Sequence, residues 1–291
     1  MTVDIAGAAA GYRPGRTHTV LSEWRRQWRR RRTQGALAFM VVLPLILLVA
    51  FEIGEDDDDG GGGGGRGQFS QLVDVATAGG LNFALFTLFV SSSFLLVVVV
   101  ALFCGDTVAS EASWGSLRYL LAIPVPRARL LGVKLVVALG YCALAMLLLV
   151  GTALLAGTMR YGWHPLQSGL AADIAPGRGL VRLLSVTGYL GLSLLVVAGL
   201  AFLLSTLTDA PLGAVGGAVL LFIVSSILDQ ITALGGIRNF LPTHYAQAYL
   251  GLLTTPVQVD DAIKGAISAL VYAAVFWGAA WLRFLRKDVT S

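Results

Sequence analysis

Charged residues gather between Asp106 and Lys134, in a stretch that separates two long apolar segments. Glu111 and Arg118 are seven residues apart and would share one face of a helix. Asp106 is placed to cap the start of that helix, and Pro124 would end it, because the residue before a proline avoids helical angles. We therefore predict an amphipathic helix that meets a cytoplasmic partner, with Glu111 paired to a basic residue of that partner.

A basic turn follows this helix, with Arg127 and Arg129 beside two prolines and ahead of the next apolar segment. Arginines at such a place can bind a partner, but they can also serve only to orient the chain in a membrane. In the same way, Glu111 and Arg118 could be solvated charges without a partner. The residues alone leave both interpretations open.

Motifs for catalysis are absent from the sequence. There is no GxxxxGK[ST] phosphate loop, and none of the three lysines (Lys134, Lys264 and Lys287) follows a glycine-rich segment. HExxH and GxSxG motifs are missing as well. We expect a protein without catalytic residues, without a cofactor of its own and unable to hydrolyse ATP by itself.

Metal and redox chemistry are not indicated either. Cys104 and Cys142 both fall in apolar segments, which favours buried side chains over a disulfide or a metal pair. His164 has no second ligand at metal-binding spacing, so we interpret it as a surface residue. The acidic and glycine-rich block from Asp56 to Gly65 is interpreted as a solvated linker, because a calcium loop would alternate its ligands with other residues.

The composition indicates the solvent in which this chain folds. With 56% hydrophobic and 13% charged residues and a mean hydropathy of +0.76, an all-α integral membrane protein is predicted. The basic residues lie beside apolar runs rather than on a polar domain, which argues against a nucleic-acid partner.

Six apolar stretches are long enough to cross a bilayer. They are expected near residues 36–53, 82–104, 130–157, 180–205, 211–228 and 263–284. This layout predicts a disordered N-terminus at 1–16, an interfacial helix at 17–34, a six-span domain at 35–285 and a tail at 286–291. Fifteen of the 21 Lys and Arg residues lie on the side that holds both termini, so that side is predicted to face the cytoplasm of a cell membrane.

The segment before the first span is strongly basic and amphipathic. Leu21, Trp24 and Trp28 recur at helical spacing, while arginines such as Arg25 and Arg29 cover the other faces. This pattern is typical of a helix that lies on an anionic leaflet with its indoles at headgroup depth. A cluster of charges that only orients the chain is the alternative.

The loop from Asp229 to Lys264 mixes aromatic and aliphatic residues, so we expect short helices there that dip into the outer leaflet. The spans themselves are almost free of ionisable groups, which disfavours a carrier driven by ions. Any transport would then draw its energy from another subunit.

The run EASWGSLRYLLAIPVPRARLLGVKL resembles the first cytoplasmic loop of the type 2 ABC exporter permeases. The matching features are Glu111, Gly115 four residues on, a Pro-x-x-Arg turn at Pro124 or Pro126 with Arg127 or Arg129, and Lys134 at the start of a span. The six-span layout, the basic helix before the first span and the long loop before the last also resemble this family. The block from Asp56 to Gly65 departs from it.

This resemblance implies the permease subunit of an ATP-driven exporter. Two such subunits, identical or different, would form a path and would each sit on a separate ATPase subunit that binds ATP and Mg. The residues implied in coupling to the ATPase are Glu111, Gly115, Arg118, Arg127 and Arg129.

The predicted spans contain two further sets of candidate residues, one for close helix packing and one for the lining of a path. Gly213 and Gly217 form a GxxxG patch that lets two helices approach closely, either at a dimer interface or within one subunit. A path in the family arrangement would be lined by Phe86, Phe89, Ser93, Phe222 and Ser226. Aromatic and hydroxyl groups suit an amphipathic or hydrophobic cargo such as a drug, a lipid or a peptide antibiotic, but they are equally ordinary packing and lipid-facing residues.

A second class of function also fits these features. The chain could be a membrane scaffold or sensor subunit that recruits a cytoplasmic partner through the same helix and transports nothing. Co-purification of a nucleotide-binding ATPase would favour export over this alternative.

Overall fold

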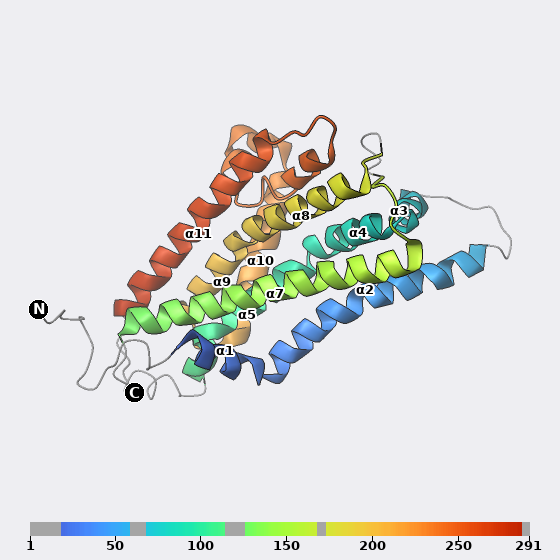
Figure 1. The fold of residues 1–291 in the computed structure, drawn as a ribbon. Helices are drawn as coiled ribbons and strands as arrows, with labels where there is room; N and C mark the ends of the chain where they lie inside the picture. The colour runs from blue at the N-terminus through green and yellow to red at the C-terminus, as the bar shows by residue number, and fades with distance from the viewer. Residues whose placement is uncertain (1–18, 59–67, 114–125, 168–172, 287–291) are drawn as a thin grey trace, which may run out of the picture.

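The computed structural model describes residues 19–58, 68–113, 126–167 and 173–286. Apart from turns and loops, this part of the chain is helical, with one isolated β-bridge between Leu166 and Ile174. Six of its helical segments are long and apolar enough to cross a membrane, so the predicted all-α membrane fold is confirmed (Figure 1). The predicted disordered N-terminus at 1–16 lies outside the described residues, and so does the tail beyond Arg286.

The described chain begins with a short helix, α1 (Val20–Trp28), whose first turn is capped by Thr19. The Thr19 hydroxyl accepts a hydrogen bond from the Ser22 amide at 3.3 Å. After a turn, the first span α2 (Arg31–Asp58) begins. The interfacial helix is therefore shorter than predicted, and the last arginines of the basic run belong to the first turn of the span.

The second span is interrupted. After α3 (Gln68–Thr77), it consists of α4 (Gly80–Ser92) and α5 (Leu95–Ser113). The break falls in a run of three serines, where the Ser92 hydroxyl donates to the carbonyl of Phe89 at 2.8 Å and so competes with helical hydrogen bonding.

The predicted helix start at Asp106 is wrong, because α5 runs through this residue to Ser113. An N-cap needs the free amides of a first turn, whereas Asp106 lies within a continuous helix and its carboxylate binds arginines from the N-terminal segment. The remainder of the predicted amphipathic helix, residues 114–125, lies outside the described residues.

The other predicted spans are each contained in the observed helices. These are α7 (Arg127–Tyr161), α8 (Pro176–Ser193) continued by α9 (Leu195–Leu207), α10 (Pro211–Gln230) and α11 (Asp260–Arg286). In α8 and α10 a proline occupies the first turn, where its missing N–H breaks no helical hydrogen bond.

Two groups of helices pack side by side in the bundle. The helix α9 packs against α5, α10 and α11, while the long α7 packs against α2 and α4 (Figure 1). Glycine allows the closest approach between α4 and α7, since a Cβ atom at Gly80 would lie 2.4 Å from the side chain of Thr158. The start of α7, the end of α11 and α1 lie at the same end of the bundle.

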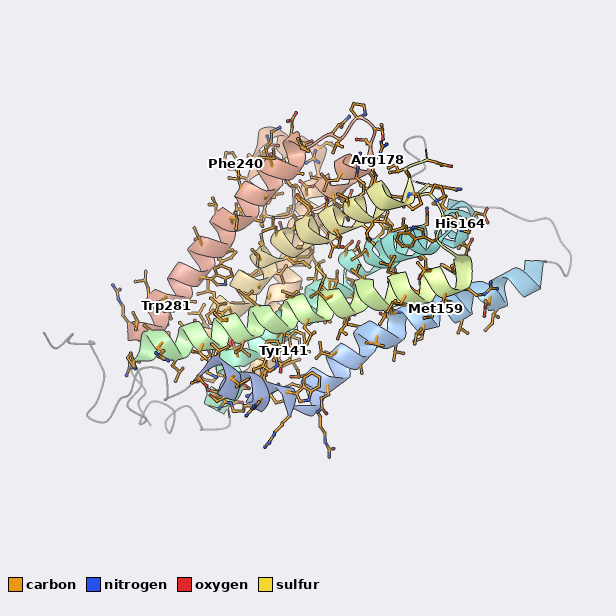
Figure 2. All side chains as sticks on the ribbon, in the orientation of Figure 1. Tyr141, Met159, His164, Arg178, Phe240 and Trp281 are labelled. Atoms are coloured by element: carbon orange, nitrogen blue, oxygen red, sulfur yellow. The ribbon has the colours of Figure 1, made fainter. Side chains whose placement is uncertain are left out.

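The loop before the last helix contains two short 3₁₀ helices, η1 (Thr232–Phe240) and η2 (Ala248–Leu253), as expected. It folds back on α8, where the Tyr189 hydroxyl donates to the carbonyl of Tyr245 at 2.5 Å. Phe240 remains 77% exposed at the end of the molecule away from Trp281 (Figure 2). The depth of this loop in a membrane stays a prediction.

Candidate functional site

A cluster of buried charges lies at the end of the bundle that holds α1. Its acidic members are Glu23 from α1 and Asp106 and Glu111 from α5, and its central cation is Lys134 from α7. All four residues are 5% exposed or less. The charges are therefore removed from water, and three of them, Asp106, Glu111 and Lys134, lie on helices that are otherwise mostly apolar.

Lys134 lies between two carboxylates. Its Nζ atom is 2.5 Å from Oε1 of Glu111 and 3.1 Å from Oε1 of Glu23. Charge-assisted hydrogen bonds of this length are among the stronger polar contacts in proteins. This one side chain therefore joins α1, α5 and α7.

Arginines from the N-terminal segment complete the cluster. Arg26 pairs with Glu111 and also with Glu23 at 3.0 Å. Asp106 is bound by Arg30 at 2.8 Å and by Arg32, so two cations compensate one buried carboxylate. A buried ion that lost its partners would keep its full desolvation penalty, so the cluster stabilises one arrangement of these helices.

The charges of the cluster act on the acidity of Glu23, which lies outside the spans. Burial is the largest single influence and by itself raises the pKa of this carboxyl. The positive charges and hydrogen bonds of Lys134 and Arg26 together outweigh burial, and the net pKa lies below the ordinary value of about 4.5. Glu23 is therefore held in its ionised form.

An aromatic stack docks α1 on α7. The rings of Trp24 and Tyr141 are stacked with centroids 4.2 Å apart, and the Tyr141 hydroxyl donates to the carbonyl of Trp24 at 2.8 Å. Gly140 leaves room for the indole, because a Cβ atom there would lie 2.6 Å from it. Figure 2 shows Tyr141 beside α1.

The two tryptophans of α1 therefore differ from one another. Trp24 stacks on Tyr141 of the bundle, while Trp28 is 49% exposed. The headgroup depth of the two indoles stays a prediction. Arg25 and Arg29 are exposed, as expected for the polar faces of the helix. Contact of these residues with lipid stays a prediction.

The predicted role of Glu111 needs a correction. We expected it to offer its charge to a basic residue of a separate protein, but it is 2% exposed and its basic partners are Lys134 and Arg26 of the same chain. The charge is satisfied internally because α1 folds over the end of α5. Two of the other predicted coupling residues, Gly115 and Arg118, lie outside the described residues.

The remaining coupling residues lie in the first turn of α7. Arg127 donates to the carbonyl of Leu285 at 3.3 Å and so links α7 to the end of α11. Arg129 lies half-buried nearby. The stretch 114–125 is therefore flanked by Glu111 on one side and by this arginine pair on the other.

The residues predicted to line a path occupy different places. Phe86 and Phe89 line a cavity of about 180 Å³ whose walls come from α3, α4, α8 and η2, together with Gln167. Ser93 lies in the break between α4 and α5, and Phe222 and Ser226 lie on α10. The structure thus brings the two phenylalanines together and places the other three residues elsewhere.

The two glycines of the GxxxG patch on α10 have different surroundings. A Cβ atom at Gly217 would lie 3.2 Å from Leu204 of α9, so this glycine serves packing within the chain. Gly213 has only Ala210 and Thr208 near it, at 3.7 Å or more. A role of Gly213 at a dimer interface stays a prediction.

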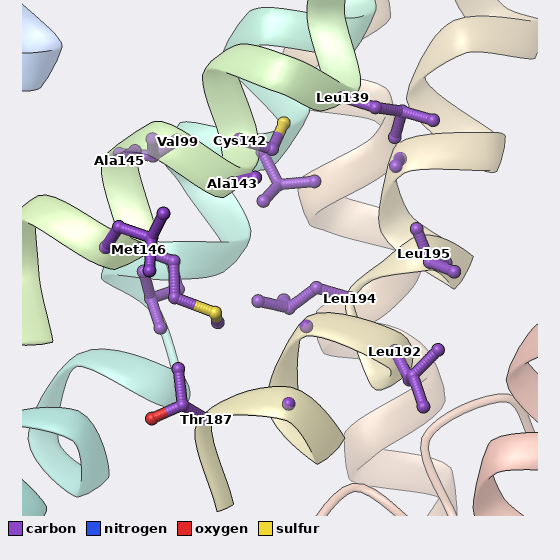
Figure 3. A pocket seen from close by; sticks show the side chains of 16 residues that line it. Val99, Leu139, Cys142, Ala143, Ala145, Met146, Thr187, Leu192, Leu194 and Leu195 are labelled. Atoms are coloured by element: carbon purple, nitrogen blue, oxygen red, sulfur yellow. The ribbon is translucent and has the colours of Figure 1, made fainter. Parts of the chain in front are cut away.

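A larger apolar cavity lies between α5, α7, α8 and α9 (Figure 3). It has a volume of about 400 Å³ and includes Cys142, Met146 and Thr187 in its lining. Cys104 and Cys142 are free thiols, and their sulfur atoms are 3.9 Å apart. The sequence predicted that both lie in apolar surroundings but not that they meet, because they are on different helices.

Sequence reasoning missed the charge cluster as a site. It treated Lys134 as the start of a span, Asp106 as a cap and the segment that contains Glu23 as an interfacial helix. A usable signal was present, because ionisable residues within a long apolar stretch are costly and therefore need partners. No group of three metal-ligating side chains occurs in the part of the chain that the structure describes.

Comparison with known proteins places this fold in a family without assigning a function to it. No curated protein matches the chain. One family model, described as "Protein of unknown function (DUF2705)", matches residues 64–290. Because that range is well over half of the chain, the protein belongs to the DUF2705 family of proteins of unknown function.

Proposed function

We propose that this chain is the membrane-spanning permease subunit of an ATP-driven exporter. It works as a dimer in a cell membrane, with both termini in the cytoplasm, and a separate ATPase subunit binds ATP and Mg. The proposal rests on the resemblance of residues 111–135 to type 2 ABC exporter permeases. A hydrophobic or amphipathic substance is the proposed cargo.

One observation supports the mechanical part of the proposal: the buried cluster ties α1, α5 and α7 together, and its member Glu111 lies three residues before the stretch 114–125 in the sequence. An ATPase that displaces this stretch acts on Glu111 at one end of it and on Arg127 at the other. Because Glu111 is bound to Lys134 and Arg26, the displacement is passed to α7 and α1 rather than absorbed locally.

Co-purification tests the proposal most directly. The full-length protein is isolated from its native membranes, and co-purified proteins are assayed for nucleotide binding and ATP turnover. We expect an ATPase subunit whose turnover changes when hydrophobic compounds are added. A partner that binds no nucleotide would support the scaffold or sensor alternative and contradict export.

Paired arginine variants test the proposed contact. Arg118→Ala is expected to reduce the amount of co-purified ATPase several-fold while the melting temperature stays unchanged. Arg178→Ala is the matched control, because Arg178 is exposed at the opposite end of the molecule (Figure 2). Equal losses of ATPase in both variants would contradict a specific contact at residues 114–125.

Cysteine crosslinking tests the proposed dimer along α10. Leu220 and Ile227 are 61% and 59% exposed, whereas Ala218 is fully buried against the rest of the chain. Leu220→Cys and Ile227→Cys should crosslink between two copies, and Ala218→Cys should not. If neither exposed position crosslinks, α10 is not the interface.

A further inference from the structure

A pocket of about 630 Å³ lies where the N-terminal segment meets the bundle. Its lining residues are Arg26, Arg29, Arg30, Arg31, Arg32, Ser110 and Glu111. They come from the end of α1, the turn at Arg29 and Arg30, the first turn of α2 and the last turn of α5. Because α2 begins and α5 ends here, the pocket lies at one end of two helices that are long and apolar enough to cross a membrane.

The pocket carries more positive charge than its own carboxylates neutralise. Arg26, Arg30 and Arg32 have acidic partners, as described above. Arg29 and Arg31 are exposed and form no ion pair within the described part of the chain. With Lys134 included, six cations face three carboxylates, which leaves an excess of three positive charges. Such an excess attracts an anion from solution or from a membrane.

Hydrogen-bond donors without an acceptor also indicate an anionic ligand. The Nε atom of Arg26 is buried and has no acceptor among the described residues. Arg31 is the first residue of α2 and lies at the positive end of its helix dipole, where the amides of Thr33 and Gln34 already donate to the carbonyl of Arg30. Guanidinium groups donate in a planar fork that matches the oxygens of a phosphate group.

We propose that this arginine pocket is a saturable binding site for phosphate oxyanions, with Arg29 and Arg31 as the residues that hold the ligand. The phosphate belongs either to the headgroup of an anionic lipid or to a soluble polyphosphate. Each ligand oxygen accepts from guanidinium N–H groups that do not already donate to carboxylates. The site goes beyond loose adsorption of α1 on a charged leaflet, and it stands independently of the proposed transport function.

The test uses native mass spectrometry of the full-length protein in neutral detergent micelles at constant ionic strength. One arm titrates phosphatidic acid against a background of phosphatidylcholine, and the other titrates inorganic pyrophosphate. The pocket variant is Arg29→Gln with Arg31→Gln. The matched control is Arg283→Gln with Arg286→Gln, which removes the same charge from exposed positions of α11 at the same end of the bundle.

We expect one tightly bound phosphate ligand per chain, with an affinity that falls about tenfold or more in the pocket variant and much less in the control. Binding of phosphatidic acid alone assigns the site to a lipid headgroup, and displacement of that lipid by pyrophosphate assigns it to a soluble anion. Equal losses in both variants would show that only the general surface charge attracts the ligand. That result, or the absence of saturable binding in both arms, would overturn the proposal.

Discussion

Lys134 is the residue on which the charge cluster depends, because it is the cation shared by two helices other than its own. It is 1% exposed and contacts Glu23 and Glu111. Such a buried lysine does not add stability compared with an apolar side chain of the same size. It does make the surrounding carboxylates dependent on its presence.

Replacement of this lysine should therefore be severe. Lys134→Met leaves Glu23 and Glu111 buried with one cation fewer, and we expect unfolding to become easier by about 3–5 kcal/mol. Thermal unfolding of the purified protein in detergent measures the effect. Adding Glu111→Gln to Lys134→Met should recover part of the loss.

A surface lysine provides the control for this experiment. Lys264 pairs with Asp261 at a position where both side chains are more than half exposed. Lys264→Gln should leave the melting temperature unchanged, since exposed ion pairs contribute little. If Lys134→Met were equally harmless, the cluster would not hold the helices together.

The acidity of Glu23 makes stability depend on pH. Its folded-state pKa is below the ordinary value of about 4.5, so the ionised carboxylate contributes stability at pH values above that ordinary value. This contribution is lost as the pH falls through the folded-state pKa. We expect the melting temperature of the wild type to fall more steeply below about pH 4.5 than that of Glu23→Gln. Parallel pH profiles for the two proteins would contradict this prediction.

At the scale of elements, an aromatic face adds to the ion pairs of Glu23 and Arg26 that hold α1 on the bundle. Trp24 stacks on Tyr141 of α7, whereas Trp28 on the same helix is largely exposed. An isolated helix of nine residues is marginal in water, so its order depends on this docking.

Limited proteolysis can distinguish the contribution of Trp24 to the docking of α1 from that of Trp28. Trp24→Ala should favour local unfolding of α1 and so increase the rate of tryptic cleavage between residues 25 and 32 several-fold. Trp28→Ala should leave the rate unchanged. The cleavage products are identified by mass spectrometry, and similar rates for both variants would mean that α1 is not held by the stack.

At the scale of the whole molecule, the bundle has two chemically different ends. One end carries α1, the arginines and the buried cluster, and the other carries the 3₁₀ helices before α11. The helix α11 alone spans about 40 Å at 1.5 Å per residue, which is enough to connect the two sides of a bilayer.

The predicted orientation can be tested at the two ends of α11. Val257 and Leu285 are 43% and 44% exposed, so cysteines at these positions should be comparably reactive. In a background with Cys104→Ala and Cys142→Ala, a membrane-impermeant maleimide added to intact cells should label Val257→Cys. It should label Leu285→Cys only after permeabilisation, because the arginine-rich end is expected to face the cytoplasm. The opposite labelling pattern would invert the topology.

The sequence alone was sufficient for the number and approximate position of the spans. The apolar stretches at 36–53, 130–157, 211–228 and 263–284 each lie within one observed helix, because the length of an apolar run reports directly on the thickness of a bilayer. The stretches at 82–104 and 180–205 each cover two successive helices, because the sequence pattern did not reveal the breaks between α4 and α5 and between α8 and α9. The short helices after Asp229 were also predictable, since mixed aromatic and aliphatic residues favour partly buried local structure.

The partners of the charged residues were decided only by the tertiary structure. Arg26 and Glu111 are 85 positions apart, and Lys134 and Glu23 are 111 apart, so their pairing depends on how the helices rotate and pack. Sequence reasoning assigned Glu111 to an external partner and Asp106 to a cap, because hydropathy measures how much of a segment is apolar but not which face it turns inward. Burial then made internal pairing necessary, since a charge that leaves water needs an opposite charge beside it.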